Sequence, residues 1–154
     1  MMRRTLGRLT LLPLLLLAIA AVAGESTHQN LDKRGIGLKG YDPVSYFISN
    51  KPLKGEANIT AEYQGATYRF ASNENRQKFL ADQPKYRPEY GGWCAKAIAD
   101  KEFVDIDPLN FKITNGRLFL FYKGFLGDAL KIWNKDEASL TTRADKNWQE
   151  IISK

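Results

Sequence analysis

The residue best suited to chemistry in this chain is a single cysteine. Cys94 is the only thiol among 154 residues. It lies between Pro84 and Ile98, a stretch that also holds a second proline, a Gly-Gly pair and three aromatic residues. A thiolate is a nucleophile and a ligand for soft metal ions, and the free N–H groups at the start of a helix favour it. Cys94 is therefore the first candidate to bind a soft metal ion such as copper, or to carry out thiol-redox chemistry.

The neighbours of Cys94 also fit a structural role. The sequence predicts a helix over about 91–99 that is apolar nearly all round, and a free cysteine in such a helix is usually an inert small hydrophobe. A catalytic thiol normally has a histidine base. The one histidine, His28, lies in a polar segment far from Cys94 in the sequence, where we expect it to be solvated. Catalysis of the cysteine-protease type is therefore not expected.

Asp42 is the second candidate metal ligand. A structural zinc site needs four Cys or His ligands, and this chain has one of each. A mixed site would combine Cys94 with carboxylates that show no spacing signature, namely Asp42, Glu89, Asp105 and Asp107. Asp42 and Asp107 each precede a proline, so helix capping and turn formation are the alternative roles for these two.

Aromatic side chains offer a further possibility for binding. They could line a pocket for a small apolar or planar ligand, or they could fill the core of the domain. The residues concerned are Tyr41, Tyr46, Tyr63, Tyr68, Tyr86, Tyr90 and Trp93. Paired catalytic carboxylates, phosphate-binding glycine loops and Ser-His-Asp arrangements have no support in the sequence.

The first 23 residues predict a secretory signal peptide. Arg3, Arg4 and Arg8 form a basic region, an apolar run follows from Leu9, and Ala21-Val22-Ala23 is a small-x-small cleavage site. The leucine-rich core favours the ordinary secretory route, with the twin-arginine route as the alternative. We expect an exported protein, periplasmic or secreted, with no membrane span after cleavage.

Charge and cysteine content limit the partners and the stabilising chemistry. The formal net charge is +6, and removal of the three arginines of the signal peptide leaves about +3. With the charges interspersed and no basic run, nucleic acid is not an expected partner. A single cysteine excludes an internal disulfide framework, so the fold must be held by packing.

The elements that position these residues follow from local patterns. After a flexible lead-in over 24–35, the sequence predicts a short helix over 43–48 and a hairpin from 58–63 and 66–71, turning at Gln64-Gly65. A helix over 73–82 comes next. The prolines at 84 and 88 then predict a rigid, extended lead-in to the helix over 91–99.

The second half contains the strongest hairpin signal. Asn115-Gly116 separates the strands 111–114 and 117–122, after a strand or extended loop over 102–107 and a turn at Asp107-Pro108. Two helices close the chain, their apolar faces formed by Phe125, Leu126, Ala129, Leu130 and Trp133, and by Leu140, Ala144, Trp148 and Ile152. The prediction is one α+β domain over 36–154 with two hairpins and about four to five short helices.

Several segments together resemble the YHS-domain family in its exported bacterial members. The resemblance runs over about 36–150. The segments are Tyr41-Asp42-Pro43-Val44-Ser45-Tyr46-Phe47, the stretch from Tyr63 to Ser72, Asn75-Arg76 with Phe79, Pro84-Lys85-Tyr86, Tyr90-Gly91-Gly92-Trp93-Cys94-Ala95, Asp107-Pro108, Asn115-Gly116-Arg117-Leu118 and Asn147-Trp148. The resemblance implies a small α+β domain and a metal-handling module with an Asp-Pro-Val-Cys motif. Ser45 replaces that cysteine here, so Cys94 is carried over as the candidate ligand, with Asp42 second.

Three functions remain open from the sequence. The leading hypothesis is an exported, non-enzymatic binding module that holds a soft metal ion, such as copper, through Cys94. The second is a thiol-redox protein that uses the same thiol. The third is a structural or interaction domain in which Cys94 is part of the core, with its partner, a small ligand or a protein, not identified.

Overall fold

The computed structural model describes residues 28–154 of the chain. The predicted signal peptide and its cleavage site lie outside these residues. In chain order, the elements are η1 (Leu38–Gly40), α1 (Ser45–Ile48), β1 (Glu56–Tyr63), β2 (Ala66–Phe70), α2 (Asn73–Ala81), α3 (Gln83–Tyr86), η2 (Glu89–Gly92), α4 (Ala95–Ala99), β3 (Asp107–Thr114), β4 (Arg117–Phe121), β5 (Lys123–Gly124), β6 (Gly127–Asp128), α5 (Ala129–Trp133) and α6 (Glu137–Ile152). The fold is α+β, as the sequence predicts.

Both predicted hairpins are confirmed. β1 pairs antiparallel with β2, and β3 pairs antiparallel with β4. In the second turn Asn115 and Gly116 have φ values of 53° and 73°, the left-handed pair that a two-residue hairpin turn requires. The residues of the turns therefore set the strand register of both hairpins. A third small sheet, formed by β5 and β6, was not predicted.

The first helices match the prediction except around Pro84. Ser72 caps α2 by accepting a hydrogen bond from the Asn75 N–H at 3.1 Å. Pro84 was expected in an extended lead-in, but it lies in the first turn of α3, capped by Asp82. A proline costs nothing there, because that N–H would have no helical partner. The extended backbone begins only at Arg87 and Pro88.

The predicted helix over 91–99 is wrong at its start. Tyr90 and Gly91 have φ values of 52° and 60°, in the left-handed region, so the backbone over Glu89–Gly92 turns without forming a regular helix. The backbone is then extended at Trp93, and α4 begins at Ala95 with Cys94 as its N-cap residue. The left-handed conformation at Gly91 cannot continue into a right-handed helix.

The turn predicted at Asp107-Pro108 is also incorrect, since both residues open β3. Asp107 pairs with Phe121 across the ladder, and a proline is accepted at the first positions of a strand. The carbonyl of Pro108 accepts a hydrogen bond from the hydroxyl of buried Tyr46 at 2.9 Å. Residues 102–106 are extended without ladder pairing, as the extended-loop alternative predicts.

The closing helices are confirmed, but two residues assigned to the first lie outside it. Phe125 and Leu126 are 94% and 78% exposed at the tip of the β5–β6 hairpin, because Gly127 at φ 120° turns the chain there. α5 starts only at Ala129. On α6 Leu140 and Ala144 are buried as predicted, whereas Ile152 at the end of the helix is exposed.

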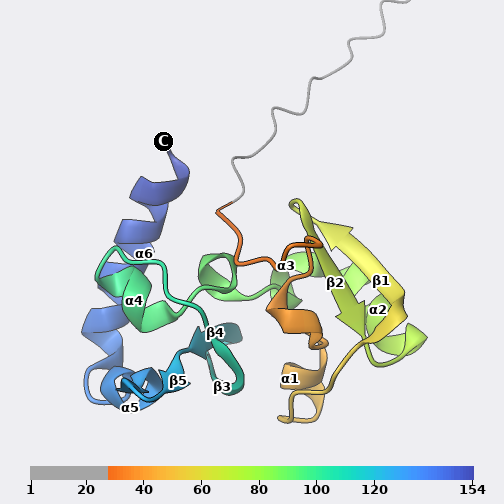
Figure 1. Ribbon diagram of the computed structural model, residues 1–154, viewed down its shortest axis with the longest axis horizontal. Coiled ribbons are helices and arrows are strands. Elements are labelled where there is room, and N and C mark those ends of the chain that lie inside the picture. The colour runs from red at the N-terminus through yellow and green to blue at the C-terminus, as the bar shows by residue number, and fades with distance from the viewer. Residues whose placement is uncertain (1–27) are drawn as a thin grey trace, which may run out of the picture.

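The core is rich in aromatic side chains. Figure 1 shows the β1–β2 hairpin with α2 on one side of the molecule and α4, α5 and α6 on the other, with β3 and β4 between them. Phe119 and Phe121 of β4 pack at 5.4 Å from the Trp133 ring, and Phe70 packs at 5.2 Å from Phe79. β4 is buried along nearly its whole length. It forms the central element of the domain.

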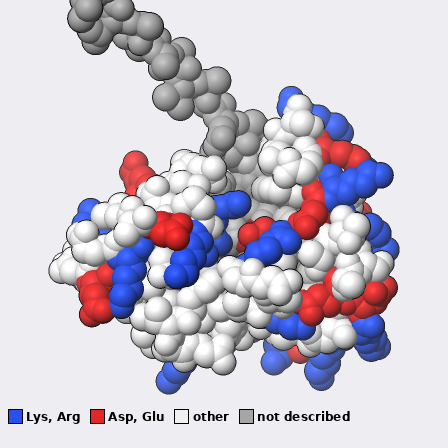
Figure 2. Space-filling model, turned by 180° about the vertical axis from the view of Figure 1, so that it is seen from behind, with Lys and Arg blue, Asp and Glu red and all other residues white. Residues whose placement is uncertain are grey.

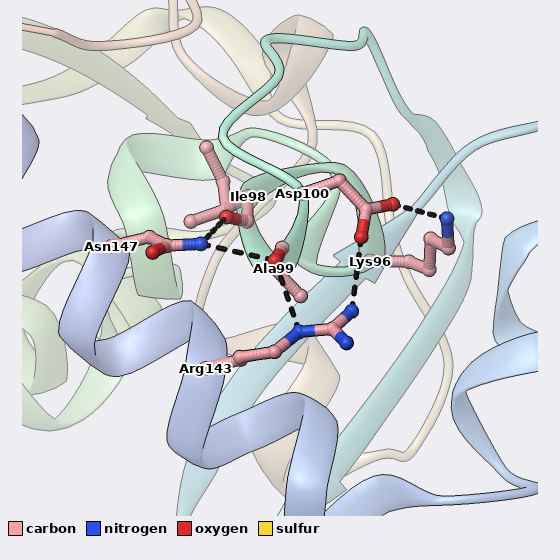
Figure 3. A network of polar contacts seen from close by, with 6 residues as sticks. All are labelled: Lys96, Ile98, Ala99, Asp100, Arg143 and Asn147. Carbon is pink, nitrogen blue, oxygen red and sulfur yellow. Dashed lines mark hydrogen bonds and ion pairs between the residues drawn. The ribbon is translucent and has the colours of Figure 1, made fainter.

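The C-terminal helix closes the end of α4. The Asn147 amide donates to the carbonyls of Ile98 and Ala99, each at 3.0 Å, and Arg143 donates to the Ala99 carbonyl at 3.2 Å and to Asp100 at 3.0 Å (Figure 3). Asp100 also pairs with Lys96. These side chains satisfy carbonyls that a helix end leaves without partners, so α4 and α6 are held in one arrangement.

The described part of the lead-in lies against the domain. The Asn30 N–H donates to the Gly91 carbonyl at 2.9 Å, and the Trp93 indole donates to the His28 carbonyl at 2.7 Å. His28 is half-buried rather than solvated, and its ring is stacked 6.1 Å from that of Phe103. Between residues 28 and 154, no helix combines the length and apolarity that a membrane span needs.

Candidate ligand-binding cleft and buried thiol

The carboxylate of Asp42 is fully buried, and both of its oxygens accept hydrogen bonds from the protein. One oxygen accepts hydrogen bonds from the N–H groups of Val44 and Ser45, at 2.8 and 3.3 Å. The other accepts from the Ala71 N–H at 2.9 Å and from the Asn75 amide at 2.6 Å. The carboxylate thus caps α1 and connects it to the β2–α2 junction. Because four hydrogen bonds from the protein occupy its two oxygens, Asp42 has a structural role in this conformation.

Ser45 stands where the family's motif has a cysteine, and its hydroxyl also has hydrogen-bond partners within the protein. Its hydroxyl donates to the Asp42 carbonyl at 2.6 Å and accepts from the Leu53 N–H at 3.0 Å. The side chain is fully buried. The serine therefore fixes the loop that follows α1.

Cys94 lies beneath β4, out of contact with solvent. Its side chain is 1% exposed, and its sulfur accepts a hydrogen bond from the Tyr122 N–H at 3.3 Å. Cys94 also bridges to Leu120, and its own N–H donates to the Val104 carbonyl. The thiol joins the start of α4 to the central strand.

The other carboxylates considered from the sequence have separate partners. Glu89 pairs with Arg117 at 2.6 Å, and Asp105 pairs with Lys39 at 2.6 Å. Asp107 accepts a hydrogen bond from the Leu109 N–H. Over residues 28–154, no group of three or more His, Cys, Asp or Glu side chains is arranged to hold a metal ion.

A cleft of about 890 Å³ is hollowed into the described part of the chain. Four segments far apart in the sequence line it: His28 and Gln29, the end of the β1–β2 hairpin, the stretch from Pro84 to Gly91, and the last part of α6; Arg117 of β4 adds to them. Its volume falls within the range of small-molecule sites.

Aromatic rings form much of the cleft wall. Tyr63 and Tyr68 come from the hairpin, Tyr90 from η2 and Trp148 from α6. The rings of Tyr90 and Trp148 are 6.1 Å apart and meet edge to face. Such surfaces favour the flat apolar body of a ligand.

An ion-pair network occupies one part of the cleft. Arg117 binds both oxygens of Asp145, at 2.7 and 3.1 Å, and pairs with Glu89. The Tyr90 hydroxyl donates to Asp145 at 2.8 Å. Burial of the Asp145 carboxylate opposes its ionisation, but the hydrogen bonds from Arg117 and Tyr90 outweigh this effect and hold its pKa below the usual range. Burial, with the bond to Asp145, raises the pKa of Tyr90.

Residues 44–90 match the sequence model of the YHS domain family. This match is consistent with a YHS domain-containing protein. The YHS domain family is associated with metal binding. No curated protein and no solved structure matches the chain.

The segment that matches the YHS model is shorter than the segment over which the sequence resembles the family. It begins two residues after Asp42 and ends four residues before Cys94. Neither candidate metal ligand therefore lies inside it. Eight cleft residues do, namely Tyr63, Gln64, Tyr68, Pro84, Arg87, Pro88, Glu89 and Tyr90. The matched segment thus supplies half of the cleft lining, and the lead-in, Gly91, β4 and α6 supply the rest.

Sequence reasoning found only some of the cleft residues. Of the seven aromatic residues singled out, Tyr63, Tyr68 and Tyr90 line it, whereas Tyr46, Tyr86 and Trp93 pack within the protein and Tyr41 lies beneath Lys54. The contribution of α6 was missed. Its signal was a second stripe at i, i+3, i+4, i+7, formed by Asp145, Trp148, Gln149 and Ile152.

Proposed function

We propose that this protein is an exported, non-enzymatic binding module that holds a small ligand with a flat apolar body in the cleft between the YHS domain and α6. The observation that supports this function best is the cleft itself, about 890 Å³ in volume and walled by four aromatic rings. Sites of this kind are mostly apolar and carry a few placed polar groups.

The polar groups of the cleft favour binding over catalysis. Arg117 is bound to two carboxylates, and the Tyr90 hydroxyl is bound to Asp145. A general acid or base must be free to exchange a proton with a substrate. Groups that already hold one another in ion pairs instead give the cleft a fixed shape.

Ligand binding can be followed by the tryptophan fluorescence of the protein, to which Trp148 in the cleft contributes, in titrations with the neutral planar probe 2-naphthamide. We expect saturable quenching, and about a tenfold loss of affinity in Tyr63→Ala, which removes one wall. Phe125→Ala is the matched control, because it deletes an equally large ring that is exposed outside the cleft. The same loss in both variants would contradict a site in the cleft.

Export is the second part of the proposal. The basic region and apolar run before Ala23 support it. Expression of the full chain in a Gram-negative host, followed by fractionation and N-terminal sequencing, should give a periplasmic protein that begins at Gly24. An uncleaved protein found only in the cytoplasm would refute this part.

Soft-metal binding through Cys94, with Asp42 as a weaker candidate, is the second function to test. It is supported by the association of the YHS family with metals and by the presence of one thiol. It requires a rearrangement, because the sulfur is buried and accepts the Tyr122 N–H. Native mass spectrometry with Cu(I), Zn(II) and Hg(II) should show metal on the natural protein but not on Cys94→Ser. Equal or absent binding by the two would exclude it.

A further inference from the structure

Arg87 is a cation in the cleft without an anionic partner. It is half-buried and lines the cleft. Within residues 28–154 its guanidinium makes no ion pair and no hydrogen bond, whereas Arg117, the other arginine of the cleft, binds two carboxylates. A guanidinium carries five donors that match the geometry of an oxyanion. Arg87 therefore has the capacity to bind an acidic group that enters the cleft.

Tyr68 brings a second donor to the same hollow. Its side chain is 2% exposed, and its hydroxyl forms no hydrogen bond with any described residue. The hydroxyl is not among the fully buried polar atoms of residues 28–154 that lack a partner, so it keeps contact with the space of the cleft. The ring is held in place, with Phe79 at 5.3 Å on one side and the backbone of Gly37 close by.

The two donors line the same cleft. Burial raises the pKa of Tyr68, while the positive charge of Arg87 acts in the opposite direction. The phenol is therefore neutral at physiological pH and can donate its proton in a hydrogen bond. A guanidinium and a phenol together form a site for the oxygens of a carboxylate.

The remaining charges of the cleft would orient an acidic ligand. Arg117, Glu89 and Asp145 together carry one net negative charge, which disfavours an anion at that part of the cleft. The half-buried ring of Trp148 is available to a ring of the ligand, and the buried ring of Tyr90 packs against it edge to face. The cleft thus separates a place for an acidic group from a place for a flat apolar body.

We propose that the ligand of the cleft is a planar aromatic acid whose carboxylate is bound by Arg87 and Tyr68. This inference rests on the proposed function and gives the ligand its chemical class. No covalent step is involved, and the protein only binds the compound.

The experiment compares two probes of nearly equal shape, 2-naphthoate and 2-naphthamide, by tryptophan fluorescence and calorimetry. The natural protein should bind the acid at least tenfold more tightly than the amide, since charge-assisted hydrogen bonds are roughly twice as strong as neutral ones. Arg87→Gln should abolish this preference, because it should weaken binding of the acid much more than binding of the amide. Tyr68→Phe should reduce the preference in part, because it removes one donor and keeps the ring.

Lys85→Gln is the matched control. It removes one positive charge two residues from Arg87, from an exposed side chain outside the cleft. If it lowered the preference as much as Arg87→Gln, general attraction would explain the result and the inference would be overturned. Equal binding of the two probes to the natural protein would also overturn it, while leaving the binding function intact. Binding of neither probe would overturn the proposed function itself. Unfolding curves of each variant show whether it has kept the fold.

Discussion

The side-chain amide of Asn75 donates a hydrogen bond at 2.6 Å to the carboxylate of Asp42, which lies 33 positions earlier in the chain. This bond joins the loop before α1 to the first turn of α2. Together with the Ala71 N–H, it occupies the carboxylate oxygen that does not cap α1.

Replacing Asp42 by alanine should lower the free energy of unfolding by about 3 kcal/mol or more, because several buried donors lose their acceptor at once. Urea denaturation measures this loss. Asp82→Ala is the control: Asp82 is exposed and caps α3 with one bond of 3.3 Å, so a loss of about 1 kcal/mol is expected. Equal losses would show that the buried network contributes little.

The buried thiol should react slowly in the folded protein. We expect iodoacetamide to modify Cys94 far faster in denaturing urea than in buffer, because reaction requires the thiolate to be exposed. Cys94→Ala should lower the free energy of unfolding by about 1–3 kcal/mol, since the Tyr122 N–H loses its acceptor. Fast labelling of the native protein would contradict the burial and would favour the thiol-redox function.

Gly91 should be sensitive to a methyl group. A Cβ at this position would lie 2.7 Å from the His28 carbonyl, and the residue has φ +60°. Gly91→Ala should therefore cost more than the roughly 1–2 kcal/mol of left-handed strain alone, and it should speed hydrogen exchange of the Asn30 N–H, which is bonded to Gly91. Gly116→Ala is the control, with φ +73° and open space around the added methyl. Equal effects on Asn30 would refute the proposed contact.

Stability should fall at acid pH as the carboxylate of Asp145 is neutralised. Its pKa is lower in the folded protein than in the unfolded chain, so its contribution is present above about pH 4 and is lost as the pH falls through the folded value. Asp145→Asn should flatten the acid side of the curve of unfolding free energy against pH. Glu62→Gln, at an exposed position, should not. An unchanged acid side in Asp145→Asn would contradict the role of the Arg117 pair.

Elements governed by neighbouring residues could be predicted from the sequence. Asn115-Gly116 specifies its hairpin because both turn residues accept the left-handed conformation, and Ser72 specifies the start of α2 as its cap. The errors at Pro84 and Phe125 have the same origin. An apolar or proline pattern allows two local structures there, and the caps and glycines beside it decide between them.

The site was harder to predict because its parts are far apart in the sequence. Tyr63, Tyr68 and Tyr90 were considered as a pocket lining, but nothing local connects them to Trp148 or Asp145 of α6. The paired arrangement of α4 and α6 in Figure 3 brings that helix into place. The two metal candidates from the sequence, Cys94 and Asp42, instead became hydrogen-bonded parts of the interior. Their metal binding stays a prediction.

One face of the molecule carries charges of both signs. On the face shown in Figure 2, Lys and Arg side chains alternate with Asp and Glu, so no broad field of one sign covers it. The charge that matters for the proposed ligand is instead the single guanidinium of Arg87 within the cleft.

The cleft is bounded by His28 at one end of the described chain and by Ile152 near the other. Its walls therefore exist only when the whole domain is folded. A compound that binds there has no counterpart site in the unfolded chain, so its concentration acts on the folding equilibrium by mass action. At one hundred times the dissociation constant, the added stability is about 2.7 kcal/mol. The melting temperature of this protein should thus rise with ligand concentration, and a thermal-shift screen of compound mixtures can search for the natural ligand without knowledge of its name.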